Sequence, residues 1–208
     1  MTGSVSGATI NGSGNTVSLT GQQETVTLNG SNETVIVGAG ATNAVVNLNG
    51  TGSTVSGLSG TAVVLSGAGN SATVIGNTDF VQLTGNSQSV TLIGSSDWLT
   101  LSGNFITLST SGARFVTLAG MNDTVTLSGT GLVTVLSGTS DSATLTSTGA
   151  NVNINGNYAT VNASGSTIGV NSTISSTTTL VGSNDTVGIA SNQSTVTLTG
   201  SNETITVS

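Results

Sequence analysis

A repeat of about nine residues limits the fold of this chain more than any other feature of its sequence. The consensus unit reads Gly-Ser-Asn-Glu-Thr-Val-Thr-Leu-Thr, and close copies begin at Gly30, Gly182 and Gly200. Hydroxyl and aliphatic side chains alternate in the second half of the unit, which is typical of a strand with one buried face. Glycine and asparagine in the first half tolerate positive φ and therefore predict a turn. We expect each unit to form one short strand and one tight turn.

Strands this short bury an apolar face only when they stack coil on coil, as in solenoid proteins. The repeat runs through residues 1–208 as a single domain, with an irregular register around residues 172–185. Large outward side chains indicate how the units close, because Phe80, Trp98, Phe115 and Leu132 recur at spacings of 18, 17 and 17 residues. We predict an all-β, two-sheet β-solenoid with about 18 residues per coil. A three-sided coil of about 27 residues remains the alternative.

The composition argues against several classes of function. One basic residue, Arg114, stands against eight acidic residues, and the formal net charge is −7. Nucleic acids and anionic membrane surfaces are bound through clustered Lys or Arg, so neither is an expected partner. No apolar run approaches the roughly 20 residues of a membrane-spanning helix. The chain has no His, Cys or Lys, and we expect the carboxylates to be solvated in turns, so we predict no enzymatic activity.

The nine-residue unit resembles the calcium-binding β-roll repeat of exported bacterial RTX proteins, whose pattern is Gly-Gly-x-Gly-x-Asp-x-hydrophobic-x. Aligned on residues 200–208, Gly200 and Val207 match, but Ile205 stands where the family has its calcium-ligating aspartate. Calcium needs oxygen ligands, so we expect neither calcium nor another cofactor. Nearly the whole chain also resembles the β-strand repeats of bacterial surface and adhesin proteins. That resemblance implies an extracellular or cell-surface location.

Two surfaces are candidates for self-association. The residues Phe80, Trp98, Phe115 and Leu132 interrupt a polar outer face, and exposed aromatic side chains often mark contacts, so we predict a lateral interface there. The alternative is that these side chains fill a corner of the coil internally. The repeat reaches both ends of the sequence without a capping element, and open strand edges pair with matching edges. The predicted end-to-end interface consists of Val5, Ala8, Ile10, Thr204, Ile205, Thr206 and Val207.

These features favour a structural, self-assembling extracellular protein that stacks end to end into a filament or surface fibre, as in a biofilm. One alternative is an ice-binding protein, because outward threonines on stacked strands form a grid of about 4.8 by 6.7 Å. The threonines expected to form this grid on one sheet are Thr91, Thr107, Thr126 and Thr144. Another alternative is a passive stalk segment of a large bacterial adhesin.

Overall fold

The chain folds into two parallel β-sheets that face each other and form a solenoid, as seen in a computed structural model. Consecutive strands alternate between the sheets, and residues paired within a sheet, such as Gly7 and Thr25, are about 18 positions apart. The predicted two-sheet solenoid is therefore confirmed, and the three-sided alternative is wrong. The structure describes residues 6–58, 60–103, 105, 107–112, 115–129, 131–172, 176–190 and 194–208, and every regular element in them is a strand.

The odd-numbered strands form a 12-stranded sheet and the even-numbered strands form an 11-stranded sheet. The larger sheet contains β1 (Gly7–Ile10), β3 (Thr25–Leu28), β5 (Val45–Leu48), β7 (Ala62–Leu65), β9 (Phe80–Leu83), β11 (Trp98–Leu101), β13 (Phe115–Leu118), β15 (Val133–Leu136), β17 (Asn151–Ile154), β19 (Thr167–Val170), β21 (Thr186–Ile189) and β23 (Thr204–Val207). The smaller sheet contains β2 (Thr16–Leu19), β4 (Thr34–Val37), β6 (Thr54–Leu58), β8 (Ser71–Asn77), β10 (Ser89–Ser95), β12 (Thr107–Ser111), β14 (Thr124–Ser128), β16 (Ser142–Leu145), β18 (Ala159–Asn162), β20 (Thr177–Val181) and β22 (Thr195–Thr199).

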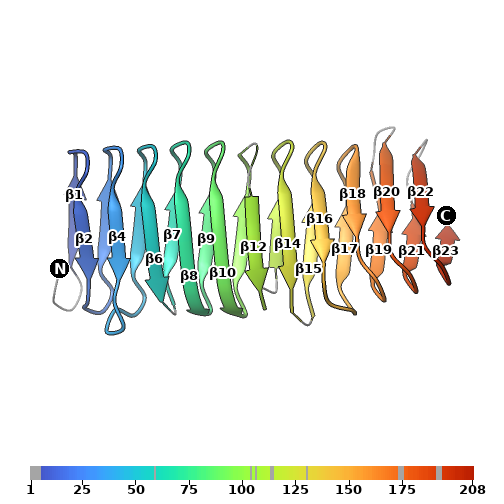
Figure 1. Cartoon of the computed structure of the whole chain (residues 1–208), viewed down its shortest axis with the longest axis horizontal. Helices are drawn as coiled ribbons and strands as arrows, with labels where there is room; N and C mark the ends of the chain where they lie inside the picture. The colour runs from blue at the N-terminus through green and yellow to red at the C-terminus, as the bar shows by residue number, and fades with distance from the viewer. Residues whose placement is uncertain are drawn as a thin grey trace.

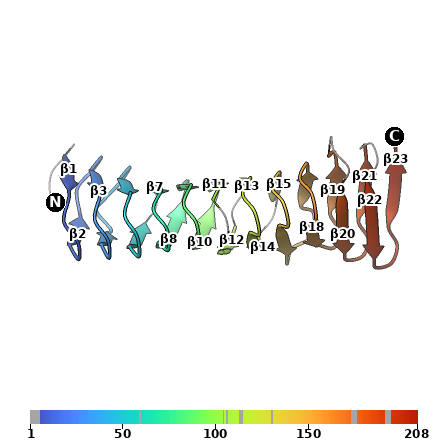
Figure 2. The same ribbon diagram turned by 90° about the horizontal axis from the view of Figure 1, so that it is seen from above.

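Stacking in sequence order makes the molecule a rod with the first and last described strands at opposite ends (Figure 1). Figure 2 shows the odd-numbered strands along one side of the rod and the even-numbered strands along the other. Every strand pairs in parallel with the strand two places along the chain, as β1 with β3 and β2 with β4. Each strand thus contacts only neighbouring coils, which is the defining property of a solenoid.

Aliphatic side chains fill the space between the sheets. Two residues of a typical strand point inward, such as Val26 and Leu28 of β3, and both are fully buried. In the 12-stranded sheet the second inward position is leucine in seven consecutive strands: Leu28, Leu48, Leu65, Leu83, Leu101, Leu118 and Leu136. Identical leucine side chains stacked strand on strand leave few gaps, so the narrow space between the sheets can be densely packed.

Glycines stack where the odd-numbered strands turn toward the even-numbered ones. The column comprises Gly12, Gly30, Gly50, Gly67, Gly85, Gly103, Gly120, Gly138 and Gly156. From Gly30 onward, a Cβ on any of these residues would overlap the carbonyl oxygen of the preceding glycine in the column. The repeat therefore needs glycine here because the backbones of successive coils approach too closely for a side chain. Other turn residues, such as Asn32 and Asn122, have a φ of 59°, which asparagine tolerates.

The register differs from the sequence interpretation around β15. Phe115 pairs with Val133 and not with Leu132, and Leu132 is buried one residue before the strand. Val133 points outward and the buried Thr134 points inward. The inward positions of β15 are therefore shifted by one residue relative to an assignment that points the valines inward. Near residues 172–185 the paired residues Val161 and Leu180 are 19 positions apart, and residues 173–175 lie outside the described part of the chain.

Candidate functional site

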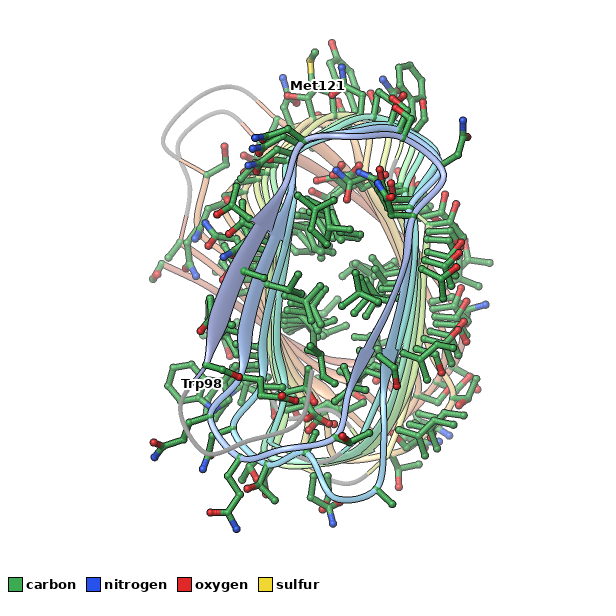
Figure 3. The ribbon with its side chains drawn as sticks, turned by 90° about the vertical axis from the view of Figure 1, so that its left-hand side faces the viewer. Trp98 and Met121 are labelled. Atoms are coloured by element: carbon green, nitrogen blue, oxygen red, sulfur yellow. The ribbon has the colours of Figure 1, made fainter. Side chains whose placement is uncertain are left out.

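All eight carboxylates occupy one kind of position, one residue before a strand, at the inner corners of the coil. They form two corner columns, one before even-numbered strands (Glu33, Asp123 and Asp141) and one before odd-numbered strands (Glu24, Asp79, Asp97, Asp185 and Glu203). Seven of them are buried, and Glu203, before the last strand, is half-buried. In Figure 3 nitrogen and oxygen atoms inside the coil gather near its turns, with carbon between the sheets. The expectation of solvated turn carboxylates was therefore wrong.

Six of the eight carboxylates accept a hydrogen bond from a backbone N–H of the preceding coil. Asp97 Oδ1 accepts a hydrogen bond from the Asp79 N–H at 3.0 Å, and Asp141 Oδ1 accepts one from the Asp123 N–H at 3.2 Å. Glu203 Oε2 accepts one from the Asp185 N–H at 2.9 Å. The donor lies at the same position of the preceding coil in every case. The carboxylates thus satisfy backbone N–H groups at corners where the strand ladder is interrupted.

Burial changes the acidity of these groups. Desolvation raises the pKa of Asp79 to about 6, against the lowering effect of the hydrogen bond from Thr61 N–H, and the charge of Asp97 raises it further. Desolvation also raises the pKa of Asp141 to about 6, against the hydrogen bond from Asp123 N–H, and the charge of Asp123 adds to the rise. The pKa values of Asp97 and Asp185 are raised mainly by burial. Burial therefore disfavours the ionised form of these four aspartates.

The sequence contains a signal that would have placed these residues correctly. Each acid lies two positions before the first inward residue of its strand, as Asp123 does before Val125. Extending the period-two alternation by one step toward the turn points the acid inward. The acidic character of the side chain favours a solvated turn, and the alternation is evident only within the strand itself.

The lateral column is only partly as predicted. Phe80, Trp98 and Phe115 are in register on the outer face of the 12-stranded sheet, with exposed fractions of 40%, 56% and 40%. The Trp98 and Phe115 ring centroids are 4.8 Å apart. Trp98 projects outward near a corner of the coil (Figure 3). Leu132 is not part of this surface, and the apolar column in register is Val45, Ala62, Phe80, Trp98, Phe115 and Val133.

The outer face of the 11-stranded sheet carries two columns that we call the hydroxyl face. The first column is Thr or Ser in all eleven strands: Thr16, Thr34, Thr54, Ser71, Ser89, Thr107, Thr124, Ser142, Thr160, Thr179 and Thr197. The second contains an uninterrupted run of Ser56, Thr73, Thr91, Ser109, Thr126 and Thr144. Thr91, Thr126 and Thr144 are thus aligned as predicted. Thr107 lies on the same face, as predicted, but in the first column, and Ser109 is the residue of β12 in the second column.

The two end faces differ in how far their inward side chains are covered. Ala8 and Ile10 of β1 are half-buried, whereas Ile205 and Val207 of β23 are 49% and 73% exposed. Ile205 and Val207 extend the inner columns of Val187 and Ile189. Thr204 and Thr206 point to the outer face and are exposed, and Val5 lies outside the described residues.

The chain offers few other features that suggest a binding site. Among the described residues there is no pocket and no group of three or more His, Cys, Asp or Glu that could hold a metal ion. The same part of the chain contains no helix long and apolar enough to cross a membrane. Comparisons with protein-family models, with curated proteins and with solved structures find no match to this chain.

Proposed function

We propose that this chain is a structural protein of the cell exterior whose copies stack end to end into a fibre. The observation that carries the proposal is the open C-terminal end face, where Ile205 and Val207 expose the end of the core. Exposed apolar residues on an edge strand, which is unpaired on one side, are a template for a further strand. The extracellular location rests on the resemblance to β-strand repeats of bacterial surface proteins.

The strand count determines how two copies fit together. The 12-stranded sheet has edge strands β1 and β23, and the 11-stranded sheet has edge strands β2 and β22. Successive strands alternate between the sheets, so the strand that continues the solenoid after β23 belongs beside β22. Copies stacked in the same orientation would place β1 beside β23 and leave a strand-wide gap beside β22.

A half-turn about the long axis removes this gap. It exchanges the two sheets of the incoming copy, so that its β1 lies beside β22 and its β2 lies beside β23. The half-turn also reverses strand direction, and because consecutive strands already run in opposite directions, both new pairs are parallel. Ile205 and Val207 then face the inward residues Val17 and Leu19 of the second copy.

The expected fibre has a defined repeat. At about 2.4 Å per strand, half the spacing within a sheet, 23 strands give about 55 Å per subunit. Successive subunits are related by about half a turn, to which the twist of the sheets adds. Negative-stain microscopy of the purified chain tests assembly, and helical reconstruction tests the symmetry. Monodisperse monomers at high concentration contradict the proposal, whereas fibres without the half-turn contradict only the interface.

We expect Val207→Lys to abolish assembly and leave the monomer folded. The side chain is 73% exposed in a single chain but would be enclosed in the stack, where an unpaired ammonium group is costly. Thr206→Lys is the matched control, because Thr206 is on the outer face of the same strand and stays exposed in the fibre. Sedimentation and microscopy of both variants provide the measurement. Equal assembly of the two variants would place the contact elsewhere.

A second candidate function is ice binding through the hydroxyl face. Its support is the eleven-strand column of Thr and Ser, next to a second column with six hydroxyl residues in succession. The aromatic side chains of the lateral column, which would disturb a flat array, lie on the opposite sheet. A regular array of methyl and hydroxyl groups is a surface that ordered water can match.

If the hydroxyl face binds ice, we expect thermal hysteresis and inhibition of ice recrystallisation by the unmodified chain. Thr126→Tyr should remove both effects, because the ring would stand above the array. Thr117→Tyr, which changes the outer face of the other sheet, should leave them intact. Nanolitre osmometry of the three chains measures the effect. An unmodified chain without hysteresis and without recrystallisation inhibition rules this function out.

A further inference from the structure

Uncharged residues show what the corner columns require of a side chain. Asn70 Oδ1 accepts a hydrogen bond from the Ser53 N–H at 2.8 Å, and its Nδ2 donates to the Gly50 carbonyl at 3.0 Å. Gln88 Nε2 donates to the carbonyl oxygens of Gly67 at 2.8 Å and Leu65 at 3.1 Å. An amide at this position therefore donates to a backbone carbonyl oxygen of the preceding coil, and Asn70 also accepts an N–H.

Asp141 occupies the same place in the same column. A Cβ on Gly85 would collide with both Gln88 Nε2 and the Gly67 carbonyl oxygen. A Cβ on Gly138 would likewise collide with both Asp141 Oδ2 and the Gly120 carbonyl oxygen. Asp141 Oδ2 therefore lies at the place in its coil where Gln88 has its donor nitrogen, Nε2.

An ionised carboxylate cannot meet this requirement. Asp141 Oδ1 accepts the Asp123 N–H, but the buried Oδ2 has no hydrogen-bond partner, and the same holds for Oδ2 of Asp79 and of Asp97. The Asp123 and Gly138 N–H groups lower the pKa of Asp141 and so favour the anion, but burial raises the pKa by more. A bare carboxylate oxygen near a carbonyl oxygen is repelled and carries the cost of a buried charge. A proton on Oδ2 converts the group into a donor and removes both costs.

We propose that the buried aspartates of the corner columns are proton-binding positions, with Asp141 neutral in the folded chain at mildly acidic pH and its Oδ2–H then donating to the Gly120 carbonyl oxygen. The pair Asp79 and Asp97 provides the same arrangement in the other column. Protons are thereby taken up as coils stack, in contrast to an ordinary surface acid, which stays ionised. These positions lie in the interior of one chain, and their protonation does not depend on assembly into fibres.

The surroundings of Asp141 contain few other titratable groups. Asp123 lies in the preceding coil and the buried Ala159 in the next. Strands β13, β14, β15, β17 and β18 bring no other titratable side chain, and Tyr158, in the neighbouring turn, is exposed. Asp79 faces Thr61 and Asp97. The sequence places Arg114 at the position after Asp97 in that column, and Arg114 lies outside the described residues.

The sign of the pH dependence follows from the direction of the shift. The folded chain binds the proton of Asp141 more tightly than the unfolded chain, since burial raises the pKa from 3.8 to about 6. The stabilisation by this proton is complete below about pH 4 and is lost as the pH rises through 6. The difference between the pKa values of the folded and unfolded chains makes the folding equilibrium constant roughly 100-fold lower at neutral pH than in acid.

Asp141→Asn tests the proposal because the chain itself uses Asn at this position in Asn70. Relative to the unmodified chain, the variant should have the same denaturation midpoint at pH 4 and a higher midpoint at pH 7.5. Gln88→Glu is the converse variant, expected to match the unmodified chain at pH 4 and to be less stable at pH 7.5.

Carbon-13 NMR of the carboxyl groups measures the pH at which each group is protonated, which a change in packing energy alone would not report. We expect the Asp141 carboxyl carbon to titrate near pH 6 in the folded chain. A titration near pH 4, the ordinary aspartate range, overturns the proposal. An Asp141→Asn effect that is equal at pH 4 and pH 7.5 overturns it as well, because a proton-linked difference must shrink as the pH falls toward the unfolded pKa of 3.8.

Discussion

Gly67→Ala is expected to lower the free energy of unfolding by at least about 3 kcal/mol. A Cβ on Gly67 would overlap the carbonyl oxygen of Gly50, which is backbone and cannot rotate away. The two coils would have to separate at this corner, which would lengthen the hydrogen bonds of the neighbouring strands. Chemical denaturation followed by circular dichroism measures the change.

Gly188→Ala is the matched control for this experiment. Gly188 lies in β21, and a Cβ there would have no neighbour within 4 Å. We expect a change of no more than about 0.5 kcal/mol. If the two variants lost stability equally, the effect would come from the general loss of glycine and not from close contact between coils.

Leu101→Ala is expected to cost about 2 to 5 kcal/mol. Leu101 is fully buried and lies between Leu83 and Leu118 in the leucine column, so its truncation leaves a cavity that the paired strands cannot easily close. The rigid spacing of the sheets limits relaxation, which places the expected cost in the upper half of this range. Urea denaturation of the variant provides the measurement.

Thr100→Ala, a change to the preceding residue on the outer face, should alter stability by less than about 0.5 kcal/mol. Val207→Ala tests position along the rod, because Val207 continues the same inner column but is 73% exposed. It should cost far less than Leu101→Ala in the monomer. Comparable losses for Val207→Ala and Leu101→Ala would contradict an interior that is closed at Leu101 and open at Val207.

The sequence was sufficient to predict the solenoid and the closure of its units in pairs. Periodic alternation specifies which face is buried, and a repeat of constant length specifies the coil. The register of individual strands was harder to predict from the sequence. At β15 the outward Val133 and the inward Thr134 reverse the usual assignment, because hydrophobicity there does not follow burial. Leu132 was misplaced for this reason, since its side chain fits a corner position that is polar in many coils.

The corner columns were missed for a different physical reason. An acid is usually exposed, and burial of a carboxylate is unfavourable unless hydrogen bonds or protonation offset it. Here the donors come from a coil about 18 residues away, as in Asp79 N–H to Asp97. Such a partner can be recognised only after the coil length and the register have been fixed.

The parallel stacking of the coils also determines how the rod would respond to a pulling force. The hydrogen bonds between coils point along the long axis, and the first and last described strands lie at opposite ends (Figure 1). Tension between those ends would load the terminal coil first, and that coil would peel away while the rest stayed intact. Each coil of about 18 residues would release roughly 60 Å of extended chain. The protein would yield in repeated steps of equal length, as an extensible tether does, and not by a single rupture.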